Sequence, residues 1–140
     1  LESLHVRMAR HCENGQAVAE FLASHPKIAY VNYCGLPGDK YHAVAEKYLP
    51  NGSCGVVSFG VKGGREAAAA FMGHLKIAAI ETHVADARTC CLHPASSTHR
   101  QMNDEQLIAA GVQPDLVRMS CGLEDKNDLI HDIAQALDQI

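Results

Sequence analysis

The chain has 140 residues, of which 47% are hydrophobic and 20% are charged, and its net charge at neutral pH is −4. A chain of this length and composition is expected to form one globular domain with its own core. The scattered charges argue against a nucleic-acid-binding protein, and no apolar run reaches the ~18 residues of a membrane helix. No secretion signal is visible and the six cysteines show no CxxC pair, so we expect reduced thiols and a cytoplasmic location.

Apolar residues at three-to-four spacing predict a helix in the first segment, residues 1–25, which Pro26 ends and Gly15 interrupts. The pattern is already present at Leu1, and nothing ahead of that residue could cap the helix. We therefore expect the chain to begin within a helix, as a fragment of a longer protein would. The next elements expected from propensity and turn signals are strands over 27–33 and 56–61 and helices over 40–49 and 65–75.

The second half of the chain continues the alternation of strands and helices. Its expected elements are strands over 76–81, 88–92 and 114–122 and helices over 103–111 and 124–140. Such alternation is typical of a layered α/β sandwich. The helices are apolar on one side, so we place them on one face of the sheet. The other face then needs a cover or serves as a functional surface.

The strand over 114–122 contains an arginine among apolar residues. Side chains alternate along a strand, so Arg118 lies on one face, opposite the face that carries Val117, Met119 and Cys121. A guanidinium in such a strand needs an anionic partner, because an unpaired buried charge is very costly. Two partners are open: an internal Asp or Glu, which the residues alone favour, or the carboxylate of a ligand, which matches the guanidinium fork.

The segment CCLHPASSTHRQ, residues 90–101, has three interpretations. A zinc site would use Cys90, Cys91, His93 and His99, but adjacent strand residues point to opposite faces and the usual ligand spacing is missing. A nucleophile motif would need a glycine-flanked turn and an identifiable base, and neither is present. We favour a strand end followed by a loop. In this loop the hydroxyls of Ser96, Ser97 and Thr98 would bond to local backbone groups, and His99 would brace the loop.

The remaining polar features are weaker. GVKGG, residues 60–64, lacks the spacing of a phosphate-binding loop and is expected to form a turn before a helix. The scattered histidines are expected to be solvated or to cap helices: His5, His11, His25, His42, His74 and His131.

Four strings occur in order along nearly the whole chain: HPKIAYVNYCGLP, KYLPNGSCGVVSFGVKGG, HPASSTHRQ and GVQPDLVRMSCGLE. Together they resemble the C-terminal domain of the O-acetylhomoserine sulfhydrylases, a branch of the pyridoxal-phosphate-dependent enzymes of cysteine and methionine metabolism. Related lyases and cystathionine γ-synthases share HPAS-x-TH and PDL-[IV]-R-x-S-x-G-[IL]-E. The string KYLPxGxxGxxxFGxKGG favours the sulfhydrylase branch.

The resemblance implies a fold and an organisation. The fold is an α/β two-layer sandwich, with a small, mostly antiparallel sheet and helices on one face, as in the C-terminal domain of fold-type I enzymes. Residues 1–140 would form a single domain that closes one side of the substrate site. The large domain that binds pyridoxal phosphate would be absent from this chain, and the intact enzyme would be a homotetramer.

The implied reaction is γ-replacement. Acetate leaves Cγ of O-acetylhomoserine and sulfide or a thiol adds, giving homocysteine or methionine, with pyridoxal phosphate as the electron sink. The alternatives are the same domain of a cystathionine γ-synthase or a methionine γ-lyase. Two different classes also stay open: a small Cys/His metal or redox module, and a stand-alone α/β interaction domain.

The resemblance also assigns residues. Arg118 matches the arginine that binds the substrate's α-carboxylate, which reverses the preference for an internal ion pair. His83 falls where sulfhydrylases carry an asparagine and lyases a serine that contacts the same carboxylate; it can donate a hydrogen bond but is bulkier and can titrate. No catalytic, cofactor-binding or metal-binding residue is expected in this chain, because its lysines do not match the motif of the Schiff-base lysine: Lys27, Lys40, Lys47, Lys62, Lys76 and Lys126. The fragment alone is expected to be inactive.

Overall fold

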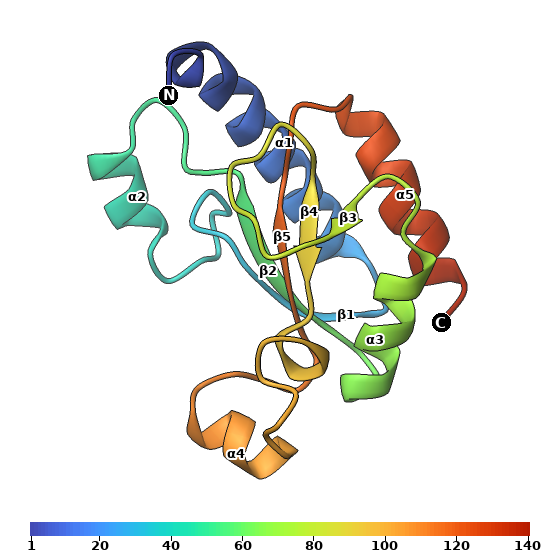
Figure 1. Cartoon of the computed structure of the whole chain (residues 1–140). Coiled ribbons are helices and arrows are strands. Elements are labelled where there is room, and N and C mark those ends of the chain that lie inside the picture. The colour runs from blue at the N-terminus through green and yellow to red at the C-terminus, as the bar shows by residue number, and fades with distance from the viewer.

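A five-stranded sheet forms one layer of the molecule, with the strands in the order β1-β2-β5-β4-β3 (Figure 1). The structure is a computed structural model that describes residues 1–140. The strands are β1 (Ile28–Asn32), β2 (Val56–Val61), β3 (Ala79–Ile80), β4 (Cys90–Leu92) and β5 (Leu116–Ser120). All neighbours pair antiparallel except β3 and β4, which are parallel. The expected small, mostly antiparallel sheet is confirmed.

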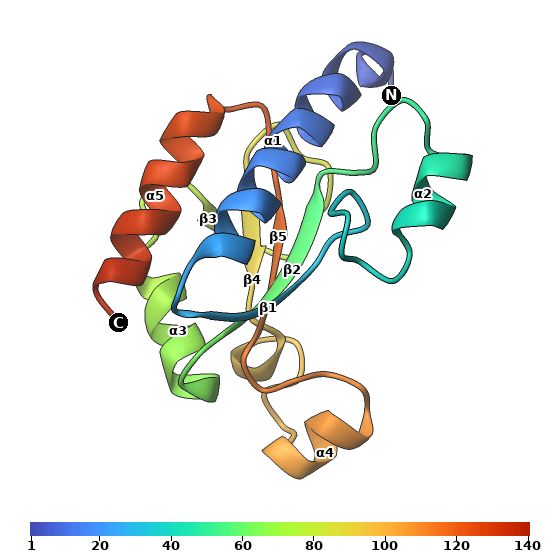
Figure 2. The ribbon, with the colours of Figure 1, turned by 180° about the vertical axis from the view of Figure 1, so that it is seen from behind.

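Three helices form the second layer, and they cover the same face of the sheet (Figure 2). They are α1 (Leu4–Ser24), α3 (Gly64–His74) and α5 (Lys126–Asp138). Two shorter helices, α2 (His42–Tyr48) and α4 (Asp104–Ala109), lie outside this layer, and a 3₁₀ turn spans Pro94–Ser96. The two-layer sandwich with helices on one face is therefore confirmed. None of the helices combines the length and apolarity needed to cross a membrane.

The strand alternation predicted for 114–122 is confirmed. Val117, Met119 and Cys121 are fully buried in the core between the layers. In that core Phe59 of β2 meets Phe71 of α3 edge to face, with ring centroids 5.8 Å apart, an arrangement that aromatic pairs prefer. The odd-numbered side chains of β5 thus join the helices to the sheet, which leaves the even-numbered ones on the uncovered face.

The strand predicted over 76–81 shrinks to two residues, and the cause is a buried carboxylate. Asp132 of α5 accepts hydrogen bonds from three successive backbone N–H groups, those of Lys76, Ile77 and Ala78, at 2.8 to 3.1 Å. These donors are consequently unavailable for pairing with a neighbouring strand. The periodicity of 76–81 could not reveal this, because the acceptor lies more than fifty residues away.

Helix α1 runs without a break through Gly15, although the sequence pattern is interrupted there. A Cβ atom at this position would lie 2.6 Å from the carbonyl oxygen of Cys54, just before β2. Gly15 therefore allows a close approach between helix and sheet, which outweighs the low helix propensity of glycine.

We predict that Gly15→Ala destabilises the chain by about 1–3 kcal/mol, because the added methyl group must displace backbone in a packed interface. Urea unfolding measures the change. The matched control is Gly73→Ala in α3, where a Cβ would meet nothing within 4 Å. That control is expected to be neutral or to stabilise by up to about 1 kcal/mol. An equal effect at both positions would contradict the packing argument.

Candidate functional site

Arg118 lies in the middle of β5, on the sheet face that the helices leave uncovered. Register pairing places Ser58 of β2 beside it on one side and Leu92 of β4 on the other, and Asn32 of β1 follows beyond Ser58. Every neighbour in this row is uncharged. The row therefore offers a single positive charge with no carboxylate beside it.

The guanidinium of Arg118 has more donors than partners. Its Nη2 donates to the backbone carbonyl of Thr82 at 2.7 Å, while its Nε is buried and has no hydrogen-bond partner. Arg118 takes part in none of the ion pairs closer than 4.0 Å. The internal salt bridge that the residues alone favoured is therefore wrong. A buried donor without a partner costs about 1–3 kcal/mol, and an anion with two oxygens could satisfy it.

The loop between β3 and β4, residues 81–89, folds over this uncovered face (Figure 1). Its middle is held by the N–H of Ala85, which donates to the hydroxyl of Ser120 at 2.9 Å. Its end is held by Thr89, whose N–H and hydroxyl both donate to Glu124 at 2.7 Å. These bonds fix the loop to β5 and to the chain after it, in addition to the bond between Thr82 and Arg118.

Ala85 is the single non-glycine residue with a positive φ, at 58°. An L-residue pays roughly 1–2 kcal/mol for this left-handed conformation. The carbonyl of Ala85 accepts a hydrogen bond from Arg7 of α1, so long-range contacts hold the strained turn in place.

His83 follows directly after Thr82 in this loop. Its side chain is 63% exposed, and its Nδ1 lies 3.0 Å from Oε2 of Glu81 and 3.9 Å from Oδ2 of Asp86. Its Nε2 has no partner in the structure. The two residues assigned by resemblance thus come from segments 35 positions apart, and the structure joins them through the Thr82 carbonyl.

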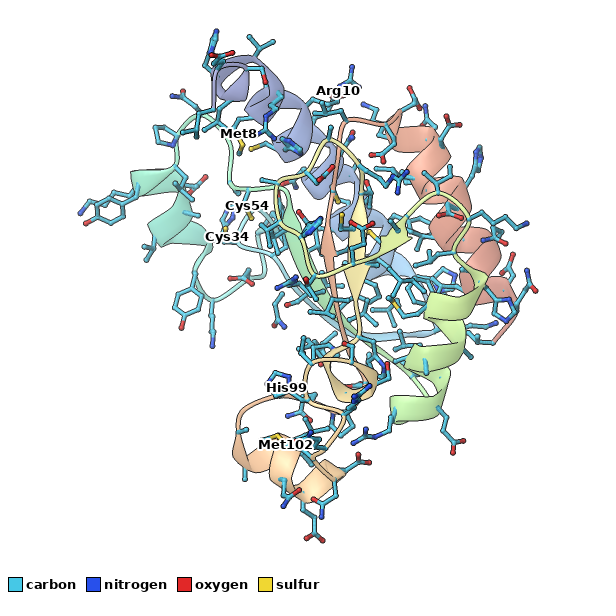
Figure 3. The ribbon with its side chains drawn as sticks, in the orientation of Figure 1. Met8, Arg10, Cys34, Cys54, His99 and Met102 are labelled. Atoms are coloured by element: carbon cyan, nitrogen blue, oxygen red, sulfur yellow. The ribbon has the colours of Figure 1, made fainter.

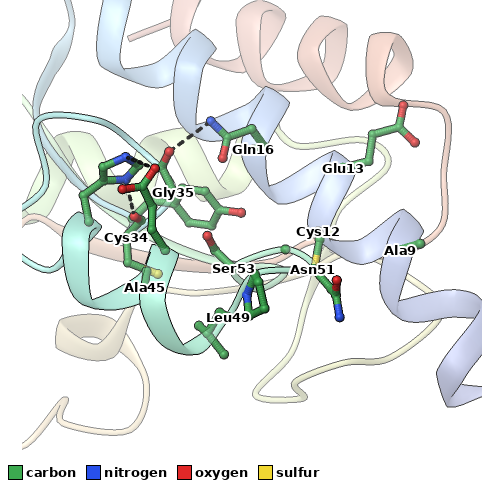
Figure 4. Close-up of a pocket in the computed structure, with 15 residues that line it drawn as sticks. Ala9, Cys12, Glu13, Gln16, Cys34, Gly35, Ala45, Leu49, Asn51 and Ser53 are labelled. Carbon is green, nitrogen blue, oxygen red and sulfur yellow. Dashed lines mark hydrogen bonds and ion pairs between the residues drawn. The ribbon is translucent and has the colours of Figure 1, made fainter.

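Two surface hollows differ in whether residues of the Arg118 row line them. One, of about 620 Å³, is on the uncovered sheet face and is lined by residues that include Asn32, Ser58 and Leu116. The other, of about 600 Å³, lies between α1 and α2 and is lined by residues that include Cys12 and Cys34 (Figure 4). The second hollow contains no residue of the Arg118 row, whereas the first contains Asn32 and Ser58 but not Arg118 itself.

The segment 90–101 forms the predicted strand end and loop, but His99 does not brace it, because its ring bonds only to the hydroxyl of the adjacent Thr98, at 2.9 Å. Cys91 lies in the core, whereas Cys90 lies on the other face, near Glu81. The hydroxyl of Ser97 donates to the carbonyl of His93 at 2.6 Å, and Nδ1 of His93 pairs with the hydroxyl of Ser96 at 2.8 Å.

His99 lies beside Met102 near α4 (Figure 3). The set Cys90, Cys91, His93 and His99 is not brought together as one cluster. All six cysteines are free thiols.

One histidine does not fit its sequence interpretation. His11 was expected to be solvated or to cap a helix, but it is 1% exposed, and its Nδ1 pairs with the carbonyl of Cys121 at 2.7 Å. Asn14, one turn later, donates to the carbonyls of Gly122 and Glu124. Both residues tie α1 to the chain after β5. A buried polar face of this kind gives no signal in apolar periodicity.

The lysines make contacts that do not fit a pyridoxal phosphate site, and Lys40 and Lys47 lie over the rings of the adjacent Tyr41 and Tyr48. The ammonium of Lys27 donates to the carbonyls of Leu137 and Ile140 at the end of α5, and Lys62 donates to the carbonyl of Pro26. Lys126 pairs with Glu13, and Lys76 lines a hollow that also contains three aspartates, which would repel a phosphate. No step of a cofactor reaction is therefore assigned to residues of this chain.

Comparison with known proteins establishes the family of the chain. Residues 1–138 match the family model described as Cys/Met metabolism PLP-dependent enzyme. The chain belongs to this family. In a fission yeast, Schizosaccharomyces pombe, the homocysteine synthase is 45% identical over 99% of the chain. The O-acetyl-L-homoserine sulfhydrylase of Leptospira meyeri is 45% identical over 100% of it.

A solved structure shows the same fold. A candidate O-acetylhomoserine (thiol)-lyase from Campylobacter jejuni superposes with a TM-score of 0.89 at 38% identity, over 98% of this chain, and contains N'-pyridoxyl-lysine-5'-monophosphate. An L-methionine gamma-lyase of Fusobacterium nucleatum is 39% identical over the whole chain. The chain spans about a third of the length of these relatives: 32% of the yeast, Leptospira and Campylobacter proteins and 35% of the lyase.

His93 supports a prediction about stability and pH. Its Nε2 pairs with the carbonyl of Pro114 at 2.8 Å, joining the end of β4 to the start of β5. Burial lowers the pKa of His93 below its ordinary value, partly opposed by this hydrogen bond. The unfolded state therefore binds a proton more readily than the folded state. The stabilising contribution is complete above about pH 6.5 and is lost as the pH falls below it.

We predict that the free energy of unfolding falls between pH 7 and pH 5, and that His93→Gln makes this fall shallower. Urea unfolding across the pH range measures both. His5→Asn is the matched control, because His5 is exposed and makes no side-chain hydrogen bond. If the wild-type slope persists in His93→Gln, another group causes the pH dependence.

Proposed function

We propose that the chain is the C-terminal, substrate-closing domain of a pyridoxal-phosphate-dependent O-acetylhomoserine sulfhydrylase, and that Arg118 binds the α-carboxylate of the amino-acid substrate. The observation that carries the proposal is a guanidinium on the uncovered sheet face, with a buried Nε that has no partner. The family membership and the 45% identity to two proteins of this activity support the same choice.

The chemistry of the site fits an amino-acid carboxylate. Two parallel N–H groups of a guanidinium match the two oxygens of a carboxylate, and the charge-assisted bonds are stronger than neutral ones. In Arg118 the Thr82 carbonyl takes up one Nη2 hydrogen, so Nη1 and the second Nη2 hydrogen also remain without a protein acceptor. The neutral neighbours Ser58 and Leu92 do not compete for the charge. Binding there would orient the substrate, and orientation lowers the entropic cost of the reaction.

His83 is proposed as the second contact to the same carboxylate. Its Nε2 has no partner in the structure, and Nδ1 lies beside Glu81. A donor at Nε2 requires either the tautomer with the proton on Nε2 or the doubly protonated ring. Because Nδ1 faces Glu81, Nε2 is the ring atom that remains for the carboxylate.

The cofactor would be held by a part of the enzyme outside this chain, since the lysines described above do not form a site for it. Bound there, pyridoxal phosphate would supply an electron sink for loss of acetate from the substrate. The residues of this domain would contribute substrate binding and orientation and would not break bonds. Acetate release and addition of sulfide or a thiol would give homocysteine or methionine.

The second candidate is the same domain of a cystathionine γ-synthase or of a methionine γ-lyase. The lyase is supported by 39% identity to an L-methionine gamma-lyase over the whole chain. The sulfhydrylase and lyase reactions can be distinguished by their products. Homocysteine formed from O-acetylhomoserine and sulfide supports the proposal, whereas breakdown of methionine without a sulfur donor contradicts it. A homotetrameric assembly and a cytoplasmic location are part of the same proposal.

In the enzyme that carries this domain, we predict that Arg118→Ala raises KM for O-acetylhomoserine and lowers kcat/KM by about 2–4 kcal/mol, the scale of losing one partner of a buried charged pair. Arg118→Lys keeps the charge but loses the fork, so a partial loss is expected. Steady-state kinetics measures both variants. Arg100→Ala is the control, because the Arg100 side chain is exposed and makes no hydrogen bond or ion pair. Unchanged kinetics in Arg118→Ala would refute the proposed role.

A further inference from the structure

A second group of reactive side chains lies at the β3–β4 edge of the sheet. Glu81, His83 and Cys90 each place one possible metal-binding atom within 4.8 Å of the other two. Nδ1 of His83 is 3.0 Å from Oε2 of Glu81, and Sγ of Cys90 is 3.9 Å from the same oxygen. This group differs from the set Cys90, Cys91, His93 and His99 considered from the sequence, and Cys90 is the one residue the two sets share.

The sheet itself brings the three residues together. Parallel pairing aligns Ile80 with Cys91, and the N–H of Glu81 donates to the carbonyl of Cys91 at 3.1 Å. Glu81 thus follows β3 beside β4, and its side chain reaches the Cys90 thiol. The loop then turns back, so that His83 faces Glu81. Backbone pairing therefore sets the arrangement before any ligand is bound, which lowers the cost of binding one.

The charges around the group call for a cation. Glu81 and Asp86 both lie near His83, and the one fixed positive charge in contact is Arg88, 4.0 Å from Glu81. Burial raises the pKa of the Cys90 thiol above its ordinary value, and the carboxylates of Glu81 and Asp86 raise it further. A divalent cation at the centre would offset the mutual repulsion of these groups.

We propose that Glu81, His83 and Cys90 form a zinc-binding site. One nitrogen, one sulfur and one carboxylate oxygen are the ligands that Zn²⁺ prefers, and three protein ligands leave a fourth position for water. Ligand atoms around tetrahedral zinc lie roughly 3–4 Å from one another, close to the 3.0 and 3.9 Å separations found here. On binding, the Cys90 thiol gives its proton to solvent and His83 coordinates as the neutral ring, so affinity rises with pH.

The site reaches beyond the proposed function and does not depend on it. Coordination at Nδ1 would leave the proton of His83 on Nε2, the donor that a carboxylate near Arg118 would meet. Zinc binding is measured without substrate, however, so its failure would leave the role of Arg118 untouched. His83→Asn separates the two further, because asparagine keeps a hydrogen-bond donor but removes the nitrogen ligand.

The test is a titration of the reduced chain with Zn²⁺ in competition with a chromogenic chelator, followed by Co²⁺ as a spectroscopic probe. We expect one zinc ion per chain, and for Co²⁺ a sulfur-to-metal charge-transfer absorption together with the intense visible bands of a tetrahedral site. His83→Asn and Cys90→Ser are each expected to weaken binding roughly tenfold or more. Cys90→Ser should also abolish the charge-transfer absorption.

Matched controls are Cys12→Ser and His99→Asn, which remove a thiol and an imidazole outside the group. They are expected to leave affinity and spectrum unchanged. Because Cys90 is buried, circular dichroism checks that Cys90→Ser is folded, and the exposed His83→Asn gives the result if it is not. Absence of stoichiometric zinc, or equal affinity in His83→Asn and wild type, would overturn the proposal and reduce the group to an ion pair beside a thiol.

Discussion

The proposed function of this domain depends on one incompletely paired guanidinium. Arg118 is anchored through Nη2 to a backbone carbonyl, which is neutral, and its buried Nε has no partner. A protein normally avoids this arrangement, since a buried donor without an acceptor lowers stability. An unpaired donor in the middle of a sheet is explained if a bound anion accepts its hydrogen bond. The same reasoning explains why the row beside it contains serine, leucine and asparagine and no acid.

The loop over residues 81–89 is the second determinant. It supplies the carbonyl that orients Arg118, it carries His83, and its first residue lies beside Cys90. Its shape is held by contacts from three other parts of the chain: Arg7 of α1, Ser120 of β5 and Glu124 after β5. A strained Ala85 at its turn shows that these contacts outweigh a local conformational cost. One short loop therefore connects the proposed carboxylate site with the proposed zinc site.

Layering separates stability from function in this fold. The helices α1, α3 and α5 and one face of the sheet bury the apolar side chains, whereas the residues of the proposed carboxylate and zinc sites lie on or beside the other face. Changes at the uncovered face would therefore disturb packing less than changes in the core. The exposed apolar residues of α2, Val44 and Tyr48, and Tyr41 just before it lie outside the helix layer and do not contribute to that core.

The sequence by itself determined what depends on local pattern. Period-two alternation placed Arg118 opposite Val117 and Met119 and separated Cys90 from Cys91, and Asn103 caps the helix predicted over 103–111 in a capping box with Gln106. These features depend on residues a few positions apart, so their physical cause is visible in one stretch of sequence. Resemblance added the assignment of Arg118 and His83 to a carboxylate, which no local pattern contains.

Only the tertiary structure decided which partners those residues meet. It removed the internal salt bridge from Arg118, placed the Thr82 carbonyl there instead, buried His11, and gathered Glu81, His83 and Cys90. It also shortened β3, because Asp132 captures the backbone donors of residues 76–78. Each of these contacts joins positions separated by chain segments whose path is set by packing of the whole domain, and packing is a property that local propensity does not contain.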